Sequence, residues 1–316
     1  MSAGVYRPHP AAADPERRRR ARERLAAGEA LLLDGATGTE LERLGLPTAL
    51  PLWSAPALID HPEVVRGVHA AYLAAGVEAV TANTFRTQRH TLAAGGLAER
   101  APELTRTAVA LARQAAEDAA AGDAHPALVL GSAPPLADCY RPDRVPDEAF
   151  LRAEHAEHAR CLDEAGVDAV LVETMNTAGE AEIATGAAVA RDLPVLASFV
   201  CWDGARLLDG SPLDAAARRA LDAGATAVGV NCLPPSNVSA CLEVLAACGA
   251  PFGVYANLGE PDDASGFRRS EDCSPGDFAE AALRWLAAGA HVLGGCCGTT
   301  PDHLAAVRRA LSGQER

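Results

Sequence analysis

The sequence contains no lysine, since all 28 of its Lys and Arg positions are arginine. A Schiff-base or other catalytic lysine is therefore excluded, because that chemistry needs a lysine amine. Positive charge is also in deficit: 42 Asp and Glu residues give a formal net charge of -14. A chain with this field repels nucleic acid and anionic membrane surfaces. We therefore expect no nucleic-acid partner and a small-molecule substrate.

Long apolar runs are lacking as well. No stretch approaches the roughly 20 apolar residues that a membrane-spanning helix needs, and the N-terminus lacks the apolar core of a secretory signal. We expect a cytoplasmic protein without a membrane partner. The nine cysteines are an odd number without the spacing of a small disulfide scaffold. In the cytoplasm they would be reduced.

Aromatic residues make up only 4% of a chain that is 49% hydrophobic. The apolar content is mainly Ala, Leu and Val, which is typical of helices packed around buried parallel strands. The basic stretch from Arg17 to Arg24 is accompanied by Glu16 and Glu23, so we interpret it as a solvated first helix rather than a transit peptide or an RNA-binding arm. We predict an N-terminal extension with this helix over residues 1–28 and one barrel domain over residues 29–316.

Short apolar runs and helical patterns alternate along the chain. The eight candidate strands are Leu31–Leu33, Ala79–Thr81, Leu128–Leu130, Ala169–Val172, Val195–Val200, Ala227–Val230, Phe252–Tyr255 and Val292–Leu293. The main helical patterns are Pro56–Ala75, Ala101–Ala121, Asp147–Ala165, Asn176–Ala190, Leu213–Ala223, Val238–Ala247, Pro275–Ala288 and Pro301–Leu311. This alternation predicts a parallel sheet.

A weak internal repeat supports the same organisation. An Ala-Gly pair precedes four of the strands, with the glycines at Gly76, Gly166, Gly224 and Gly289. Each glycine is typical of a helix C-cap that turns the chain into the next strand. Eight such units without a break in composition predict an α/β fold of the closed (β/α)₈ TIM barrel type.

In such a barrel the functional groups lie at the C-terminal ends of the strands. Those positions hold an unusual concentration of polar and sulfur-containing side chains, namely Asp34, Gly35, Thr84, Glu173, Asn231, Cys232, Cys296 and Cys297. Three of them are cysteines. Because the strands before Cys232 and before Cys296 are separated by only one strand around the ring, their ends can converge on one point.

Three cysteines with one open position are the ligand set of a catalytic zinc ion, which is tetrahedral. Three thiolates make the ion poor at activating water, whereas a substrate thiol in the fourth position would stay ionised and nucleophilic. The pattern therefore indicates alkyl transfer to sulfur. A vicinal disulfide between Cys296 and Cys297 and a structural zinc are the alternatives. The six remaining cysteines are interpreted as buried apolar side chains or surface thiols.

These strand ends resemble those of the homocysteine S-methyltransferase family. The resemblance runs from about Leu31 to Leu304 and is carried by the segments Leu33–Leu41, Thr81–Phe85, Val172–Thr174, Gly229–Cys232 and Gly294–Pro301. It implies that Cys232, Cys296 and Cys297 hold Zn²⁺ with homocysteine sulfur in the fourth position.

The resemblance also implies that Asp34 and Glu173 hold the substrate ammonium group. A structural cap or an arginine pair is the alternative for each carboxylate. Thr84 and Asn231 either donate hydrogen bonds to the substrate carboxylate or brace the loops. Gly35 is expected to allow a close backbone approach.

The implied reaction is an in-line attack of the homocysteine thiolate on a donor methyl group, which gives methionine. The segment Thr174–Asn176 resembles the users of S-methylmethionine or S-adenosylmethionine. Betaine, a corrinoid donor or another thiol acceptor are alternatives within the same fold. A zinc-thiolate redox sensor and a non-catalytic scaffold are alternatives from other classes.

Overall fold

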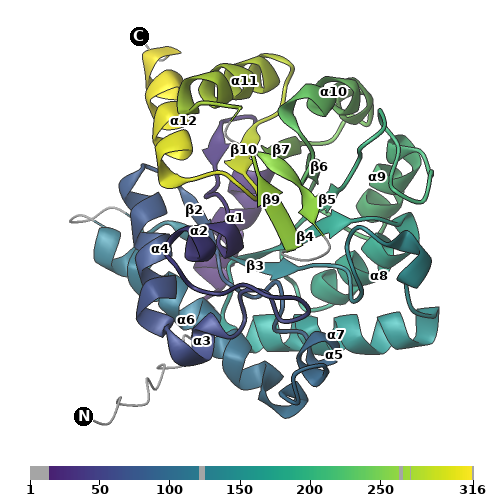
Figure 1. Cartoon of the computed structure of the whole chain (residues 1–316). Helices are drawn as coiled ribbons and strands as arrows, with labels where there is room; N and C mark the ends of the chain where they lie inside the picture. Colours follow the sequence, from purple (N-terminus) through teal and green to yellow (C-terminus); the bar gives the residue numbers. More distant parts are fainter. Residues whose placement is uncertain (1–13, 121–124, 263–265, 271, 315–316) are drawn as a thin grey trace.

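Eight parallel strands form a barrel in the computed structural model, which describes residues 14–120, 125–262, 266–270 and 272–314 (Figure 1). The strands are β1 (Leu31–Leu32), β2 (Ala79–Thr81), β3 (Leu128–Ala133), β4 (Ala169–Met175), β5 (Val195–Phe199), β6 (Ala227–Asn231), β7 (Phe252–Ala256) and β10 (Val292–Gly295). Their order is β1-β10-β7-β6-β5-β4-β3-β2. A parallel bridge between Leu33 and Ala79 joins the two end strands. The predicted TIM barrel is confirmed, with all eight strands at the expected places.

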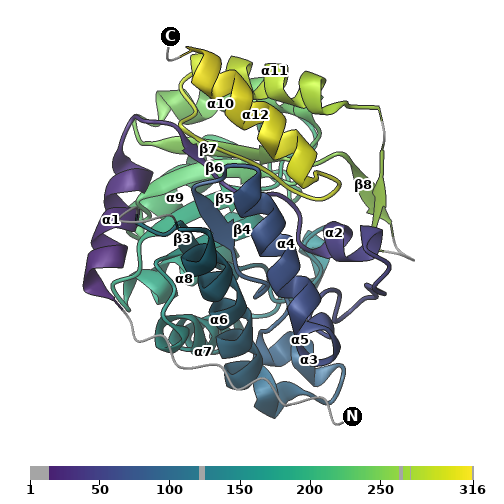
Figure 2. The ribbon, with the colours of Figure 1, turned by 90° about the vertical axis from the view of Figure 1, so that its left-hand side faces the viewer.

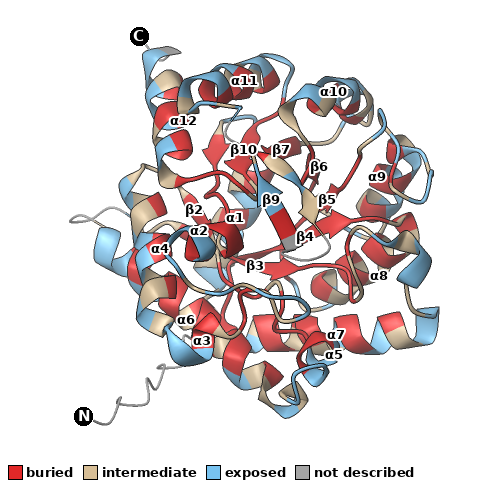
Figure 3. Cartoon of the chain, viewed as in Figure 1, coloured by how far each residue is buried: buried red, intermediate tan, exposed pale blue. Residues whose placement is uncertain are grey.

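Side chains alternate between the two faces of each strand, and this alternation divides the core into two parts. Side chains at Leu128, Leu130 and Leu171 belong to a cluster inside the barrel. Their neighbours Val129 and Val170 belong to the larger cluster between the strands and the helices. Because both faces of the sheet are covered, the barrel strands are buried almost throughout (Figure 3), and Thr81 at the end of β2 is half-buried. The period of two then determines which polar residues near the strand ends face inward.

The main helices surround the barrel, and most begin and end within a few residues of their predicted limits. They are α3 (Ala57–Asp60), α4 (Pro62–Ala74), α6 (Ala101–Ala119), α7 (Glu148–Ala165), α8 (Ala178–Val189), α9 (Leu213–Asp222), α10 (Val238–Ala247), α11 (Pro275–Ala287) and α12 (Pro301–Gln314). The glycines of the four Ala-Gly pairs have φ values of 91°, 81°, 100° and 100° in chain order. These left-handed conformations confirm the predicted C-caps.

The single helix expected over Pro56–Ala75 is instead divided into α3 and α4. His61 lies between them with φ -143° and ψ 50°. It precedes Pro62, whose ring disfavours helical backbone at the preceding residue. The prediction of one continuous helix was therefore wrong at this position.

Shorter elements lie around the C-terminal end of the barrel. They are the helices α2 (Gly38–Arg43) and α5 (Arg89–Ala93), the 3₁₀ turns η1 (Ala98–Arg100), η2 (Pro142–Arg144) and η3 (Pro235–Asn237), and the antiparallel hairpin of β8 (Gly259–Asp262) and β9 (Gly266–Arg269). The hairpin lies over the barrel opening in Figure 1, and β8 and α2 lie on the same side of the molecule in Figure 2.

Helix α1 (Pro15–Ala26) lies at the opposite end of the barrel (Figure 2). Its Ala21 and Leu25 side chains are buried in the inner cluster, and His291 Nε2 lies 2.8 Å from the carbonyl oxygen of Leu25. The expected first helix is present, but only one of its faces is solvated. Residues 1–13 of the expected extension lie outside the described part of the chain. None of the described helices is long and apolar enough to cross a membrane.

Candidate functional site

A cavity of about 310 Å³ opens at the C-terminal end of the strands. Its walls include six of the eight residues singled out from the sequence, namely Asp34, Gly35, Glu173, Cys232, Cys296 and Cys297. They come from the ends of β1, β4, β6 and β10. The barrel thus brings together residues that are up to 263 positions apart in the chain.

The three cysteine sulfurs lie within 4.8 Å of one another. Thiolates around a tetrahedral zinc ion, each about 2.3 Å from it, would be about 3.8 Å apart. The backbone near these cysteines is held on both sides, since Cys296 N donates to Ala256 O at 2.8 Å and Leu258 N donates to Cys297 O at 2.7 Å. The three residues therefore fit a metal ion as a group.

The burial of Cys297 bears on the form of its thiol. Burial raises the pKa of the Cys297 thiol to about 12. Such a thiol is protonated at neutral pH unless a cation stabilises its ionised form. Cys297 is therefore not a free thiolate nucleophile at neutral pH.

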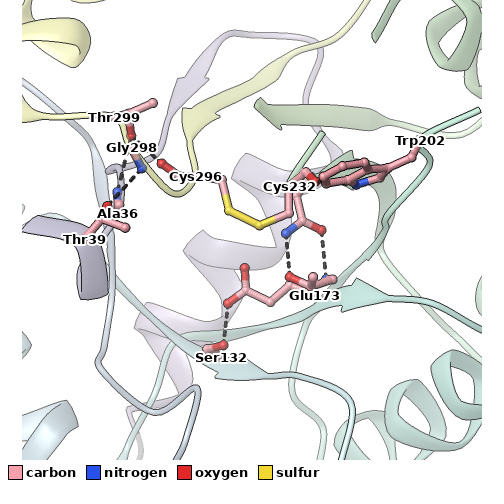
Figure 4. The surroundings of a disulfide bond; sticks show 11 residues. Ala36, Thr39, Ser132, Glu173, Trp202, Cys232, Cys296, Gly298 and Thr299 are labelled. Carbon is pink, nitrogen blue, oxygen red and sulfur yellow. Dashed lines mark hydrogen bonds between the residues drawn. A yellow bond between two sulfur atoms is a disulfide. The ribbon is translucent and has the colours of Figure 1, made fainter. Parts of the chain in front are cut away.

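Cys232 and Cys296 are joined by a disulfide in this structure, with a Cα–Cα distance of 5.6 Å (Figure 4). This structure differs at this pair from the expectation that the cysteines are reduced, because two sulfurs close enough to share one metal ion are also close enough to bond. Cys297 is free, so the structure does not contain the vicinal disulfide considered as an alternative. Reduction of the bond would restore three thiols at the cavity.

Two carboxyl groups lie in the same cavity. Asp34 accepts hydrogen bonds from Thr81 N at 2.8 Å and from Thr81 Oγ1 at 2.9 Å. Burial raises its pKa to about 8. Glu173 accepts a hydrogen bond from Ser132 Oγ, and burial raises its pKa to about 7.

No arginine forms an ion pair with either carboxyl in the part of the chain that the structure describes, so the arginine-pair alternative is not supported. Asp34 does link β1 to β2, as a structural role would require. Both groups remain able to bind a cation, since a buried carboxylate without a charged partner gains most from one.

Asn231 and Thr84 are buried and do not line the cavity. Asn231 Oδ1 accepts a hydrogen bond from Thr174 N, and Asn231 Nδ2 donates to Thr174 Oγ1, both at 2.8 Å. Thr174 has φ 59°, which is costly for a β-branched residue unless neighbours hold it. The residue before it is Glu173, so these contacts fix the end of β4 that carries the carboxyl.

Thr84 supports the same carboxyl indirectly, through Ser132. Its hydroxyl donates to Ser132 O at 3.0 Å and accepts from Ser132 N at 2.8 Å. Ser132 in turn donates to Glu173. The contacts of Thr84 and Asn231 therefore favour bracing over direct binding of the substrate carboxylate.

Gly35 lies where helix α4 and the loop after β10 approach the loop after β1 closely. A Cβ atom at this position would lie 2.6 Å from Thr299 Oγ1 and 2.7 Å from Tyr72 Oη. The Tyr72 hydroxyl donates to Ala36 O at 3.0 Å. The expected close approach at Gly35 is present, and it is an approach to side chains of the protein itself.

Several cavity residues were not predicted from the sequence. They include Trp53, Arg86, Ser132, Cys139, Tyr140 and Tyr255. Ser132 and Tyr255 continue the inward-facing alternation of β3 and β7, and this signal was available from the strand pattern. Cys139 was interpreted as an apolar side chain or surface thiol, but it lines the cavity.

The architecture is that of a barrel enzyme with a cysteine-based candidate metal site and two buried carboxyls at its C-terminal mouth. The homocysteine S-methyltransferase family profile matches residues 31–311. Homocysteine S-methyltransferase of Escherichia coli strain K12 is 36% identical over 296 residues, which cover 88% of this chain and 94% of that protein.

Solved structures agree. The metallated form of the homocysteine methyltransferase MmuM from Escherichia coli has a TM-score of 0.79 at 32% identity and covers 89% of this chain and 96% of its own. The oxidized form of that enzyme has a TM-score of 0.78 at 32% identity and covers 89% of this chain and 95% of its own. The chain belongs to the homocysteine S-methyltransferase family, and it is a methyltransferase.

Proposed function

We propose that the protein transfers a methyl group from S-methylmethionine or S-adenosylmethionine to the thiol of L-homocysteine, with Zn²⁺ held by Cys232, Cys296 and Cys297. The observation that carries this proposal is the meeting of three cysteine sulfurs within 4.8 Å at the wall of a cavity that also contains two buried carboxyls. When bound, the zinc ion would keep the substrate thiol ionised at neutral pH. Because the three cysteines must be reduced, we also place the enzyme in the cytoplasm.

The chain's own residues would then bind and orient the two substrates. Asp34 and Glu173 would receive the ammonium group of homocysteine, and ionisation of both carboxyls would follow from the added positive charge. Ser132 would hold one oxygen of Glu173, while Thr84 and Asn231 would fix the strand ends around it. Holding two reactants in line is capable of supplying roughly 7 to 11 kcal/mol in favourable cases.

The reaction balances without a general base at the methyl carbon. A bond forms between the homocysteine sulfur and the methyl carbon while the bond from that carbon to the donor sulfonium breaks. The donor leaves as a neutral thioether, and its positive charge is neutralised by the thiolate. A sulfonium donor therefore suits a site that presents an anionic sulfur nucleophile.

The test is a donor panel with isotope-labelled homocysteine. Reduced, zinc-loaded protein is incubated with ¹³C-labelled homocysteine and, separately, S-methylmethionine, S-adenosylmethionine, betaine or methylcobalamin. The label is needed because demethylated S-methylmethionine is itself methionine. We expect ¹³C-labelled methionine by mass spectrometry with a sulfonium donor. Labelled methionine only with betaine or methylcobalamin would refute the donor assignment, and none with any donor would refute the proposed function.

The disulfide favours one second candidate, a zinc-thiolate redox sensor. A sensor would release zinc when Cys232 and Cys296 are oxidised, without any affinity for homocysteine. The enzyme proposal requires reduced, zinc-loaded protein to bind homocysteine. Titration calorimetry with homocysteine and with L-methionine as a thiol-free control distinguishes the two functions.

A further inference from the structure

Arg86 is a buried cation at the wall of the cavity. It follows β2, the residue is 9% exposed, and it lines the cavity together with Phe85. Its Cζ atom lies 5.0 Å from the centroid of the Phe85 ring. The guanidinium therefore contacts an aromatic ring on one side and borders the cavity.

No described Asp or Glu forms an ion pair with Arg86, and its guanidinium donates no hydrogen bond to the described residues. Its buried Nε lacks a described acceptor, as does the Nε of Arg113, so the two arginines differ at their terminal nitrogens. The buried Arg113 shows how the same chain satisfies a guanidinium internally. Arg113 donates to both carboxylate oxygens of Asp168, at 2.6 and 2.9 Å, and to Gly166 O at 3.1 Å. Arg86 has no equivalent set of acceptors.

This difference matters because an arginine cannot lose its charge in a protein. A buried cation is costly unless an anion or several acceptors compensate for lost hydration. The protein supplies that compensation to Arg113 and leaves Arg86 facing the cavity. The missing partner is therefore expected to be part of a ligand, and a planar carboxylate matches the guanidinium fork.

The other charged side chains at the cavity wall indicate which kind of ligand this is. Arg141 pairs with Asp143, Asp138 accepts a hydrogen bond from Tyr140 N, and Asp262 has a partner of its own. Asp34 and Glu173 offer negative charge to an ammonium group, and Arg86 offers positive charge to a carboxylate. An α-amino acid carries both groups on one carbon. We propose that Arg86 binds the α-carboxylate of an amino-acid substrate and thereby determines the preference for substrates that have one.

This inference rests on the proposed function, and two substrates could supply the carboxylate. It belongs either to homocysteine or to an amino-acid sulfonium donor. Arg86 is in this sense a specificity residue, which holds a substrate away from the reacting sulfur and methyl carbon. Its loss should affect KM much more than kcat.

The test compares Arg86→Gln and Arg86→Lys with the matched control Arg144→Gln. Arg144 is an exposed arginine at the end of η2, in the loop that follows β3, and it does not line the cavity. KM is measured separately for homocysteine and for the donor. We expect Arg86→Gln to raise one KM about 10- to 100-fold, the effect of losing a charged hydrogen-bonded partner. Arg86→Lys should recover part of this loss, and Arg144→Gln should match the wild type.

Analogues without the carboxylate identify the source of the effect. Wild-type protein should prefer homocysteine to 3-aminopropane-1-thiol if the acceptor is held. It should prefer S-methylmethionine to the corresponding (3-aminopropyl)dimethylsulfonium ion if the donor is held. In Arg86→Gln the relevant preference should fall by the same factor as KM rises. Unchanged KM values and unchanged preferences for both substrates would refute the proposal.

Two readouts do not depend on turnover. Calorimetric binding of homocysteine and of 3-aminopropane-1-thiol to each variant tests whether Arg86 binds the homocysteine carboxylate, even if no methyl donor reacts. Absence of turnover with every donor can therefore be distinguished from a wrong assignment of Arg86. Thermal unfolding tests a structural role. Because the proposal gives Arg86 no anionic partner within the protein, and the Phe85 ring supplies a cation–π contact alone, Arg86→Gln should unfold near the wild-type temperature. A large decrease together with unchanged ligand preference would overturn the proposal.

Discussion

Substitution of Glu173 by Gln tests the electrostatics of the site without any assay of activity. Burial raises the pKa of Glu173 from 4.5 to about 7. The native state thus keeps a proton that the unfolded chain releases near pH 4.5. The contribution of Glu173 to stability is therefore greatest below pH 4.5 and is lost as the pH rises through 7. A shift of this size corresponds to about 3 kcal/mol, at about 1.4 kcal/mol for each unit of pKa.

The measurement is urea unfolding of reduced, metal-free protein at pH 4.5 and pH 8. The wild type should lose about 3 kcal/mol more than Glu173→Gln between these two values, because the amide cannot ionise. Asp34, whose pKa burial raises to about 8, contributes the same sign of slope in both proteins. The charge of Glu173 also raises the pKa of Asp34, so the difference between the two slopes reports Glu173 together with its effect on Asp34.

Glu148→Gln is the matched control. The Glu148 side chain is 69% exposed and pairs with Arg152 on the surface of α7, so its removal should leave the pH slope of the wild type unchanged. If the wild type and Glu173→Gln lost the same stability between pH 4.5 and pH 8, burial would not be holding a proton on Glu173. Burial could then not be the reason why Glu173 would bind a cation.

Three further substitutions test the metal site, the brace and the close approach. Cys297→Ala should abolish both zinc binding, measured by elemental analysis, and turnover, whereas Cys273→Ala should retain both; retained zinc in Cys297→Ala would contradict the ligand assignment. Asn231→Ala should destabilise the protein by about 1 to 3 kcal/mol in urea unfolding, because it leaves a buried backbone N–H of β4 unpaired, and an unchanged midpoint would show that the brace is dispensable. Gly35→Ala should lower stability by about 1 to 3 kcal/mol through overpacking, whereas Gly179→Ala, whose Cβ would meet nothing within 4 Å, should not; equal effects would contradict the contact geometry.

The fold was predictable because its signals are local and repeated. Each strand is a short apolar run, and each Ala-Gly pair marks a helix end, so all eight strands could be placed. The hairpin of β8 and β9 was missed because Gly259–Asp262 contains glycine, proline and acidic residues instead of an alternating apolar pattern. The break at His61 was missed because helical periodicity continued across it.

The site was predictable only in part, because strand ends are the least certain limits in a sequence. The third strand was expected to end at Leu130, whereas β3 continues to Ala133. This extension places Ser132 inside the barrel, two residues beyond Leu130, where it reaches Glu173. Arg86 was missed for another reason. Its significance depends on the lack of an acidic neighbour among the described residues, which is a property of three-dimensional structure.

The bracing of Glu173 shows why the barrel and the site cannot be separated. Thr84, which follows β2, is hydrogen-bonded to the backbone of Ser132 on β3. Ser132 donates a hydrogen bond to Glu173 on β4. Asn231 on β6 accepts a hydrogen bond from Thr174, the residue that follows Glu173. Each of these contacts joins different strands, so the carboxyl is positioned by the register between strands more than by its own loop. A slip of one residue in a strand would turn its polar side chain to the opposite face. The geometry for recognising an ammonium group therefore depends on the same strand register that brings the three cysteine sulfurs together.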